Sequence, residues 1–467
     1  MTAPDLHGKR VLVVGLAKSG VAAARLCAAQ GAHVVANDLH DEATLGAETV
    51  RALRDAGCEL ALGQHDAALF TSVDRIVVSP GVPALPALEA AMAAGIPIAG
   101  EIELASWFVA SDVVVGITGT NGKSTVTTLV GEMLARSGRP TFVGGNLGTP
   151  LVDVVGSDAA RAGGAVVVEL SSYQLERVER FRAHVAVLLN ITDDHLDRHG
   201  SLAAYAAAKA RVFHGQRAGD HAIVPAGDAV VGALARAAAS TVHTFGGADG
   251  EVRVVDGALV DVVSGLRVPL VELRIRGAHN ASNACAAALA ARLAGVSAAD
   301  IAHVLRSFAG LAHRMVWVRE RDGVTFYDDS KATNVGATVA ALDGLRDAHP
   351  RIVLIAGGLD KGGSYAPMVE RLSSFGRAAV LIGTAAPLIE RALAGTALPV
   401  ERADSLEQAV VRAAALAQPG DAVLLAPACS SLDMFRNYEH RGDEFARAAR
   451  ALTPAESAPA GAGEAPR

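Results

Sequence analysis

The stretch GITGTNGKST, residues 116–125, reads as a strand end, a glycine turn and a helix start. An apolar run over 113–117 precedes the turn, and from Val126 onward apolar residues recur at helical spacing. Such a turn offers backbone N–H groups and a helix N-terminus to a phosphate. It departs from the usual P-loop pattern, because Ile117 stands where the first glycine is expected. The stretch therefore predicts an α/β domain with a phosphate site of unusual form.

Apolar runs of strand length recur along the chain. They cover residues 11–14, 76–78, 113–117, 166–168, 185–189, 352–355, 380–382 and 423–425. Their continuous pattern is typical of strands buried on both faces of a parallel sheet, and the alanine-rich segments between them predict covering helices. Polar and glycine residues follow nearly every run, at the sheet edge where such folds bind ligands. The fold class is therefore α/β with largely parallel sheets.

The length of 467 residues favours three domains, at roughly 150 residues each. We expect a Rossmann-like domain over 1–105, a central P-loop-type ATPase domain over 106–310 and a Rossmann-like domain over 311–452. Partly alternating apolar residues on either side of Asp256-Gly257 predict a hairpin, and so a small antiparallel appendage on the central domain. The tail over 453–467 is rich in Pro, Ala and Gly and is predicted to be disordered.

Composition excludes several classes of protein. No apolar run approaches the roughly 18 residues of a membrane span, and the first residues lack the apolar segment of a signal peptide. A net charge of -7 disfavours a protein that coats nucleic acid. The four cysteines have no paired spacing, which argues against a zinc site and a disulfide framework. We expect a cytoplasmic protein.

Two glycine loops are candidate phosphate sites. In the loop over 118–125, Lys123 would bring a positive charge to a phosphate, and Ser124 or Thr125 would bring a hydroxyl to Mg²⁺. The alternative is that this loop is an ordinary turn before a helix. The loop over 15–20, followed by Asp38 at the end of the next predicted strand, is similar to a dinucleotide fingerprint. Its middle glycine is replaced by Ala17, so binding of a nucleotide or diphosphate and simple packing both stay open.

Other polar residues have two interpretations when they are taken alone. Lys209 on an alanine-rich helix would ordinarily be a solvated lysine, and His195 a surface or capping residue. Asp193 and Asp194 would be read as helix caps. The pair Asn280 and Asn283 could cap a helix that starts near residue 281.

Eight further stretches occur in one order along the chain. They are GGNLGTP (144–150), VVELSSYQLE (167–176), LNITDDHLDRHG (189–200), YAAAK (205–209), GAHNASNACAA (277–287), DDSKATN (328–334), GGLDKG (357–362) and PACSSLDMFRNYEHRGDEF (427–445). Together with TGTNGKST they resemble the Mur ligases and the related folylpolyglutamate synthetases, whose loop also lacks the first P-loop glycine. NGKST, DSKATN and the C-terminal stretch resemble the members that add D-glutamate.

The resemblance implies ATP-driven amide formation. A substrate carboxylate attacks the γ-phosphate to give an acyl phosphate, and an amine then displaces phosphate. The implied reaction adds D-glutamate to UDP-N-acetylmuramoyl-L-alanine with release of ADP and phosphate, in cytoplasmic peptidoglycan precursor synthesis. It implies ATP and two Mg²⁺ ions as cofactors, a monomer, and no nucleic-acid partner or membrane span.

The resemblance also assigns roles to residues. The implied catalytic residues are Lys123, Glu169, His195, Lys209 and Asn146. The implied metal ligands are Ser124, Glu169, His195 and Lys209, the last as a carbamate formed from a neutral amine and CO₂. Implied ATP contacts are Gly119, Thr120, Asn121, Gly122, Lys123, Ser124, Thr125, Asn280, Asn283, Arg314 and Asp329.

Substrate contacts implied by the resemblance fall into two groups. The UDP-sugar group is Ser19, Asp38, Ser79, Pro80 and Gly81, and the D-glutamate group is Lys331, Thr333, Lys361, Ser431 and Tyr438. Three positions depart from the family pattern: Leu39 replaces a common Thr, Tyr438 replaces a Phe, and the loop after Lys361 holds an extra small residue.

Other functions fit parts of the sequence. An NAD-dependent dehydrogenase explains the loop over 15–20 and Asp38 but gives Lys123, Glu169 and Lys209 no role. A P-loop kinase or ATPase explains residues 118–125 and predicts ATP turnover without an amino acid. A non-catalytic protein of the same fold would tolerate loss of Lys123 or Glu169. The nearest alternative is another Mur ligase or a folylpolyglutamate synthetase.

Overall fold

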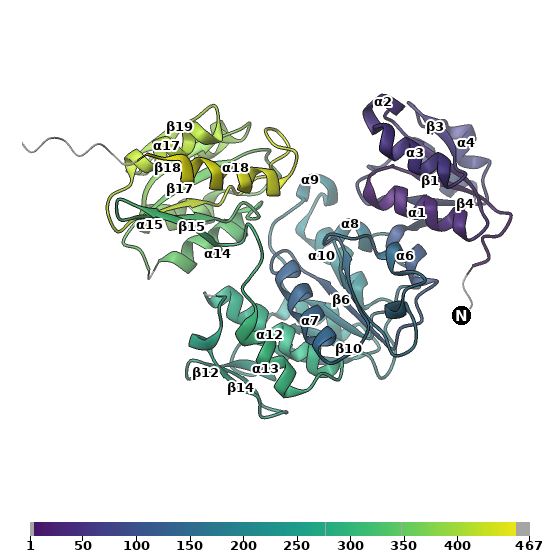
Figure 1. Cartoon of the computed structure of the whole chain (residues 1–467), viewed down its shortest axis with the longest axis horizontal. Helices are drawn as coiled ribbons and strands as arrows, with labels where there is room; N and C mark the ends of the chain where they lie inside the picture. Colours follow the sequence, from purple (N-terminus) through teal and green to yellow (C-terminus); the bar gives the residue numbers. More distant parts are fainter. Residues whose placement is uncertain (1–3, 276, 347, 454–467) are drawn as a thin grey trace, which may run out of the picture. The chain divides into compact units, whose positions relative to one another are not determined.

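The computed structural model describes residues 4–275, 277–346 and 348–453 and contains three sheets (Figure 1). The chain divides into two compact units, which we describe separately. Unit 1 comprises Met1–Ile191, Ala203–Arg276 and Asn280–Ala309, and unit 2 comprises Thr192–Leu202, Gly277–His279 and Gly310–Arg467. Nearly all of the tail predicted to be disordered, residues 454–467, lies outside the described residues.

The first sheet, in unit 1, has five parallel strands in the order β3-β2-β1-β4-β5. The strands are β1 (Arg10–Val14), β2 (His33–Asp38), β3 (Glu59–Leu62), β4 (Arg75–Val78) and β5 (Ile98–Gly100). The helices are α1 (Lys18–Ala29), α2 (Glu42–Leu45), α3 (Ala47–Asp55), α4 (Ala67–Thr71), α5 (Pro86–Ala93) and α6 (Glu101–Ser106). The strand order reverses direction at β1, so the crevice beyond the ends of β1 and β4 is a topological switch point, where doubly wound sheets bind ligands.

The second sheet, also in unit 1, has nine strands in the order β14-β13-β12-β11-β10-β9-β6-β8-β7. Its strands are β6 (Val113–Thr118), β7 (Thr141–Gly145), β8 (Ala165–Glu169), β9 (Val185–Leu188), β10 (His221–Pro225), β11 (Thr241–Phe245), β12 (Val252–Val255), β13 (Ala258–Asp261) and β14 (Arg267–Pro269). From β7 to β11 the pairing is parallel. The strand β6, which leads into the phosphate loop, lies between β9 and β8 and is fully buried.

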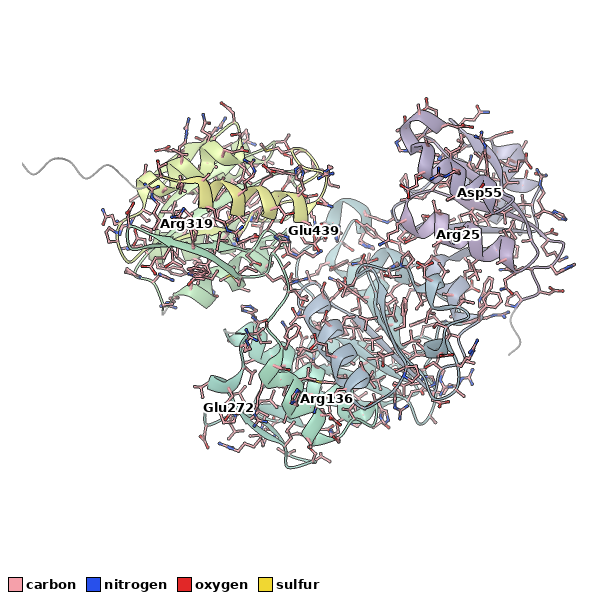
Figure 2. All side chains as sticks on the ribbon, in the orientation of Figure 1. Arg25, Asp55, Arg136, Glu272, Arg319 and Glu439 are labelled. Atoms are coloured by element: carbon pink, nitrogen blue, oxygen red, sulfur yellow. The ribbon has the colours of Figure 1, made fainter. Side chains whose placement is uncertain are left out.

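Helices and short 3₁₀ turns connect these strands. They are α7 (Lys123–Arg136), η1 (Leu151–Val154), η2 (Asp158–Ala160), α8 (Ser172–Leu175), α9 (Leu196–His199), α10 (Leu202–Ala210), η3 (Arg211–Phe213), α11 (Ala229–Arg236), η4 (Leu270–Glu272), α12 (Ala278–Leu293) and α13 (Ala298–Ser307). Side chains fill the spaces between helices and sheets, as Figure 2 shows on the same ribbon.

The predicted antiparallel appendage is confirmed. Strands β12 and β13 pair antiparallel with Val255 opposite Ala258. The two residues between them, Asp256 and Gly257, have φ values of 48° and 68°, as a tight hairpin turn requires. The hairpin is joined to the parallel sheet, because β12 pairs with β11, and β14 adds one more antiparallel strand.

The third sheet, in unit 2, has six strands in the order β15-β16-β20-β17-β18-β19. They are β15 (Val316–Arg321), β16 (Val324–Asp328), β17 (Ile352–Gly357), β18 (Gly376–Ile382), β19 (Val400–Arg402) and β20 (Ala422–Leu425), and only the edge strand β15 pairs antiparallel. The helices are α14 (Val335–Leu345), α15 (Ala366–Phe375), α16 (Ala386–Leu393), α17 (Leu406–Leu416) and α18 (Tyr438–Ala451). Arg319, labelled in Figure 2, donates to the carbonyls of Ala449 and Arg450 and so ties β15 to the end of α18.

Each of the eight apolar runs of the sequence forms a buried strand, although the run over 185–189 extends one residue beyond β9. The prediction of an α/β fold with largely parallel sheets is therefore confirmed. Among the described residues, no helix has both the length and the apolar character needed to cross a bilayer.

Candidate active site

The phosphate loop connects the end of β6 at Thr118 to the start of α7 at Lys123. No side chain caps the N-terminus of α7, and its first turn holds no acidic residue. The uncapped N–H groups and the helix dipole together make this end attractive to an anion.

Two glycines give the loop its shape. Gly119 has φ +148°, and a Cβ there would lie 2.9 Å from the Cβ of Leu189. Gly122 has φ +85°, and a Cβ there would lie 2.3 Å from Oδ1 of Asn283. Both positions therefore demand glycine for conformation and for space. This contact also brings Asn283, a predicted ATP contact, against the phosphate loop.

Lys123 folds back over its own loop. Its Nζ donates to the carbonyl oxygens of Gly119, at 2.9 Å, and Thr120, at 2.8 Å. An ammonium that is held by backbone carbonyls beside a helix N-terminus can exchange these carbonyls for the oxygens of an anion with little movement. Behind it, the hydroxyl-bearing residues Ser124 and Thr125 are 3% and 5% exposed.

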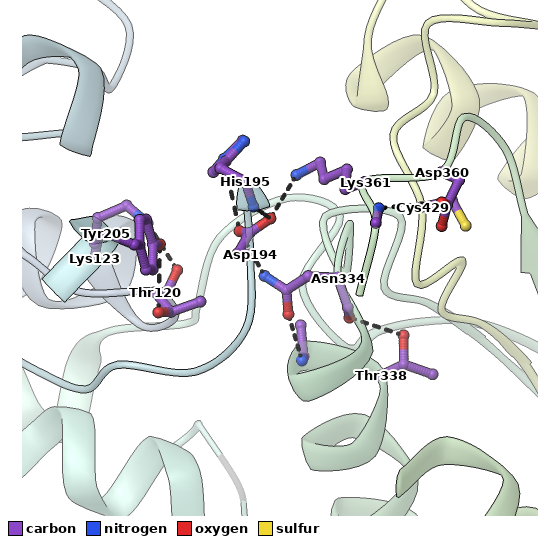
Figure 3. Close-up of polar contacts among 12 residues, drawn as sticks. Thr120, Lys123, Asp194, His195, Tyr205, Asn334, Thr338, Asp360, Lys361 and Cys429 are labelled. Atoms are coloured by element: carbon purple, nitrogen blue, oxygen red, sulfur yellow. Dashed lines mark hydrogen bonds and ion pairs between the residues drawn. The ribbon is translucent and has the colours of Figure 1, made fainter. Parts of the chain in front are cut away.

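Lys209 is buried in α10 and also faces the loop. It is 1% exposed, and its Nζ donates to the carbonyl of Gly119 at 2.7 Å. The ring of Tyr205, one turn earlier, lies 4.6 Å from this ammonium, and its hydroxyl donates to Oγ1 of Thr120 at 3.4 Å (Figure 3). The interpretation of Lys209 as a solvated lysine is therefore wrong, because the helix buries it against the phosphate loop.

Glu169 ends the neighbouring strand β8 and is 2% exposed. Nδ2 of Asn146 donates to its Oε1 at 2.6 Å, and the backbone N–H of Asn146 donates to its carbonyl at 2.9 Å. The loop that carries Asn146 approaches β8 so closely that a Cβ on Gly145 would lie 2.4 Å from the carbonyl oxygen of Glu169. Unit 1 thus brings together the predicted catalytic residues Lys123, Asn146, Glu169 and Lys209.

Asn190 also bonds to the phosphate loop, although no role was predicted for it from the sequence. Its Oδ1 accepts from the N–H of Asn121 at 2.9 Å, its Nδ2 donates to the carbonyl of Asn121 at 3.1 Å, and its own carbonyl accepts from the N–H of Thr120 at 2.9 Å. The signal was present, since Asn190 follows directly after an apolar run. These bonds join the loop to the residue that follows the apolar run of β9.

Asn280 and Asn283 lie inside α12, which begins at Ala278. Nδ2 of Asn283 lies 3.4 Å from Oδ1 of Asn280, one turn away. The interpretation of the pair as caps of a helix starting near 281 is wrong, because the helix begins at Ala278 and the two side-chain amides contact each other within it.

In unit 2, Asp194 is the centre of a polar cluster (Figure 3). It is 7% exposed and accepts from Nδ2 of Asn334 at 3.1 Å, while Nζ of Lys361 lies 3.3 Å from its Oδ1. The N-cap of α9 is His195 and not an aspartate, so the cap interpretation of Asp194 is wrong. His195 has φ 53°, a left-handed value that costs a histidine strain, and its side chain makes no cap hydrogen bond.

The predicted D-glutamate residues lie in unit 2 after strands β16, β17 and β20. Nζ of Lys331 lies 3.7 Å from the ring centroid of Tyr438, and the carbonyl of Tyr438 accepts from Oγ of Ser330 at 2.8 Å. The N–H of Thr333 donates to the carbonyl of Lys331, and Ser431 is 3% exposed. A small pocket is lined by Asp193, Asp194, Asn334, Val335, Asp360, Lys361, Gly363, Ser364, Tyr365 and Ala428.

Two further predicted ATP contacts share one environment in unit 2. Burial raises the pKa of Asp329 to about 7, and the positive charge of Arg314 opposes that rise. The N–H of Met315 donates to Oδ1 of Asp329 at 3.3 Å. Burial also lowers the pKa of His279, and the charge of Arg314 adds to that effect.

The predicted UDP-sugar residues gather at the switch point of the first sheet. Ser79 follows β4 and donates from Oγ to the carbonyl of Gly15 at 2.6 Å. Asp38 ends β2 and accepts from the N–H of Leu16 at 2.6 Å. Burial acts to raise the pKa of Asp38, but hydrogen bonds from the backbone of His40 and Leu16 outweigh it, and the pKa is lowered.

Among the side chains that the structure describes, no three His, Cys, Asp or Glu residues form a metal site. The predicted ligand set holds only two residues of these types, Glu169 in unit 1 and His195 in unit 2. The other two predicted ligands, Ser124 and Lys209, belong to unit 1, as Glu169 does.

Three family models match successive parts of this chain. The Mur ligase MurD-like N-terminal domain matches residues 9–100, the Mur ligase middle domain 117–291, and the Mur ligase glutamate ligase domain 313–429.

Similar whole proteins are also known. A UDP-N-acetylmuramoylalanine--D-glutamate ligase from Anaeromyxobacter dehalogenans is 49% identical over 463 residues, covering 96% of this chain and 99% of the relative. The enzyme of the same name from Myxococcus xanthus is 47% identical over 461 residues, covering 96% and 99%. The structure of UDP-N-acetylmuramate-alanine ligase MurC from Thermotoga maritima matches with a TM-score of 0.59 and 18% identity, over 95% of this chain and 100% of that one.

The three models together span most of the chain, and the relatives match it almost from end to end. The phosphate loop without its first P-loop glycine, which the sequence placed at residues 118–125, lies within the region matched by the middle-domain model. The dehydrogenase and the simple P-loop kinase, which explain only parts of the sequence, do not account for these matches. The chain belongs to the Mur ligase family.

Proposed function

We propose that this chain is an ATP-dependent ligase that adds D-glutamate to UDP-N-acetylmuramoyl-L-alanine, releasing ADP and phosphate. The observation that carries the proposal is that Lys123 and Lys209 both bond to the phosphate loop in unit 1, while Glu169, held by Asn146, ends the strand paired with β6. The names of the relatives at 49% and 47% identity support the choice of amino acid. Another Mur ligase or a folylpolyglutamate synthetase is the alternative that the experiment below distinguishes.

The first step joins two anions. A carboxylate oxygen of the alanine residue attacks the γ-phosphorus of ATP, an O–P bond forms, the bond from the γ-phosphorus to the β,γ-bridging oxygen breaks, and ADP leaves. The loop N–H groups and the ammonium of Lys123 bind the phosphate oxygens and reduce the repulsion between the reactants. For this, Lys123 exchanges the carbonyls of Gly119 and Thr120 for phosphate oxygens.

The oxygen donors beside the loop fit Mg²⁺. The hydroxyl of Ser124 and the carboxylate of Glu169 are the ligand types that this ion prefers, and both side chains are buried. We propose these two, with His195, as ligands of two Mg²⁺ ions. When bound, Mg²⁺ offsets the negative charge of the triphosphate. Asn146 holds the carboxylate of Glu169 in a fixed orientation.

We further propose that Lys209 carries a carbamate. The neutral amine adds to CO₂, a C–N bond forms and one proton leaves, so that a cation becomes an anionic oxygen donor. Support comes from its burial at 1% exposure, because a site that disfavours the ammonium makes the neutral amine available. The carbamate would add metal-binding oxygens beside Glu169.

In the second step the amine of D-glutamate attacks the acyl carbon. The C–N bond forms, the C–O bond to phosphate breaks, and the amine loses a proton. We propose that the cations Lys331 and Lys361 bind the two carboxylates of D-glutamate, with Thr333, Ser431 and the backbone of Tyr438 as further contacts. Asp329, Arg314, Asn280 and Asn283 would contact ATP.

We assign the UDP-sugar to the switch point of the first sheet, with Ser19, Asp38, Ser79, Pro80 and Gly81. The domain limits proposed for these roles are 1–105, 106–310 and 311–452. We also propose that the chain acts as a monomer in the cytoplasm.

The test is phosphate release from ATP with Mg²⁺ and UDP-N-acetylmuramoyl-L-alanine, with D-glutamate, L-glutamate, L-alanine, L-lysine or diaminopimelate offered in turn. Release with D-glutamate alone is expected. Release with a different amino acid would move the chain to another branch of the family. Equal release without any amino acid would contradict ligase chemistry.

A further inference from the structure

The loop over 144–152 links two parts of unit 1. On its inner side, Asn146 holds Glu169 through the two hydrogen bonds described above. The loop also closes on itself, since the N–H of Gly145 donates to the carbonyl of Thr149 at 2.7 Å. Any change in the position of this loop therefore reaches Glu169 through the backbone and side chain of Asn146 and through the strand pairing of Gly145 with Glu169.

On its outer side, two ionisable side chains from the N-terminal part of unit 1 hold the same loop. Nζ of Lys18 donates to the carbonyl of Gly148 at 2.5 Å. Oε1 of Glu101, the first residue of α6, accepts from the N–H of Val152 at 2.8 Å. The turn η1, which contains Val152, packs against both α1 and α6. The loop is thus anchored at its middle by an exposed lysine and at its end by a buried carboxylate.

Lys18 belongs to the other glycine loop of unit 1. It is the first residue of α1, directly after Ala17, and the N-terminus of α1 has neither a side-chain cap nor an acidic residue in its first turn. Its neighbour Leu16 is held by Asp38, and Gly15 by Ser79. A lysine at this place is therefore in contact with the loop over 144–152 and within the loop assigned to the UDP-sugar.

We propose that Lys18 is a positioning residue, which couples the loop over 15–20 to Asn146 and Glu169 through the carbonyl of Gly148. The proposal rests on the proposed function, because it takes Glu169 as part of the reaction site. Lys18 would not touch the reacting atoms. It would keep Asn146 in place for Glu169 and make that placement sensitive to what occupies the loop over 15–20.

Hydrogen exchange of the free chain tests the contact without relying on activity. In K18M the amides over 144–152 should exchange about threefold to tenfold faster than in the parent chain, the effect of losing one exposed charge-assisted hydrogen bond. K18R keeps a donor and should restore slow exchange. K9M is the matched control, since Lys9 is also exposed and its side chain makes no hydrogen bond or ion pair among the described residues. Unchanged exchange in K18M, or equal acceleration in K9M, would overturn the proposal.

Steady-state kinetics test the consequence. K18M should lower kcat about threefold to tenfold and raise KM for UDP-N-acetylmuramoyl-L-alanine, with KM for ATP and the melting temperature unchanged. K18R should recover most of the loss, which a merely structural defect would not predict. Equal kinetics in K18M and the parent chain would contradict the coupling. A parent chain that releases no phosphate with any amino acid would refute the proposed function, and hydrogen exchange would still decide the role of Lys18.

Discussion

Unit 1 contains two glycine loops of the same local form, at residues 15–20 and 118–123, and they differ in how they are closed. Each follows a buried parallel strand and precedes a helix whose N-terminus no side chain caps. The second loop is lined by the side chains of Lys123 and Lys209, and Nζ of each donates to the carbonyl of Gly119. The first is closed by an anion, since Asp38 accepts from the N–H of Leu16.

This difference indicates that the two loops have different roles. A loop that carries the ammonium of Lys123 is suited to a phosphate that changes charge during a reaction, because the ammonium can exchange its carbonyl partners for phosphate oxygens. A loop already held by a carboxylate and by the hydroxyl of Ser79 is rigid and suited to recognition.

The largest effect is expected in the second loop. K123A should lower turnover about ten-thousandfold, because it removes a cation that stabilises the transferring phosphoryl group. The measurement is phosphate release at saturating substrates. K18M, the equivalent removal of a lysine from the first loop, should cost far less. Comparable losses in the two variants would break the distinction between the loops.

Lys209 is the next most sensitive position. K209A should lower turnover about a thousandfold, because a buried group beside the loop is lost together with its proposed carbamate oxygens. Single-turnover phosphate release gives the size of the loss. Near-parental turnover in K209A would refute a role for this lysine in the reaction. Incubation of the parent chain with ¹³CO₂ and observation of a carbamate carbon by NMR would test the modification itself.

A pH effect on stability is expected from Glu101. Burial raises its pKa from 4.5 to about 7 in the folded chain. The folded state then holds the proton more tightly than the unfolded state, so the contribution to stability is full below pH 4.5 and is lost as pH rises through 7. The loss is about 3 kcal/mol at most. E101Q does not titrate, and melting curves from pH 5 to 8 should show its stability rising relative to the parent chain. Parallel curves would contradict this prediction.

The smallest effect is expected from Asp38. D38A should raise KM for the UDP-sugar about tenfold, because the N–H of Leu16 loses its acceptor and the first loop loses its closure. KM for ATP should not change. D38N keeps one acceptor oxygen and should fall between the two. Steady-state kinetics with each substrate varied in turn give the two KM values. A rise in KM for ATP in D38A would contradict the separate roles of the two loops.

The central strands were predictable, and several edge strands were not. All eight apolar runs are strands because burial on both faces leaves a continuous apolar signal. The edge strand β3, with the sequence ELAL, is only partly buried and gives no such signal. In β15, with Val316 and Trp317 exposed, alternation is broken by an irregular register between Trp317 and Arg319. These strands form because neighbours supply hydrogen-bond partners, which sequence does not reveal locally.

The site shows the same limit. The phosphate loop could be read from its own spacing, because the constraint on Gly119 and Gly122 is local. Lys209 could not, since its burial depends on the packing of α10. A usable signal was that α10 carries alanine on nearly every face, which is typical of a helix enclosed by protein. Asp194 depends on Asn334 and Lys361, which lie far along the chain.

The most direct test of the account follows oxygen from the substrate carboxylate. The chain would be given ATP, Mg²⁺, D-glutamate and UDP-N-acetylmuramoyl-L-alanine labelled with ¹⁸O in the alanine carboxylate, and the released phosphate would be analysed by mass spectrometry. Attack of the carboxylate on the γ-phosphate predicts one ¹⁸O in each phosphate released. Phosphate without label would contradict the acyl-phosphate route, and with it the role assigned to the second loop.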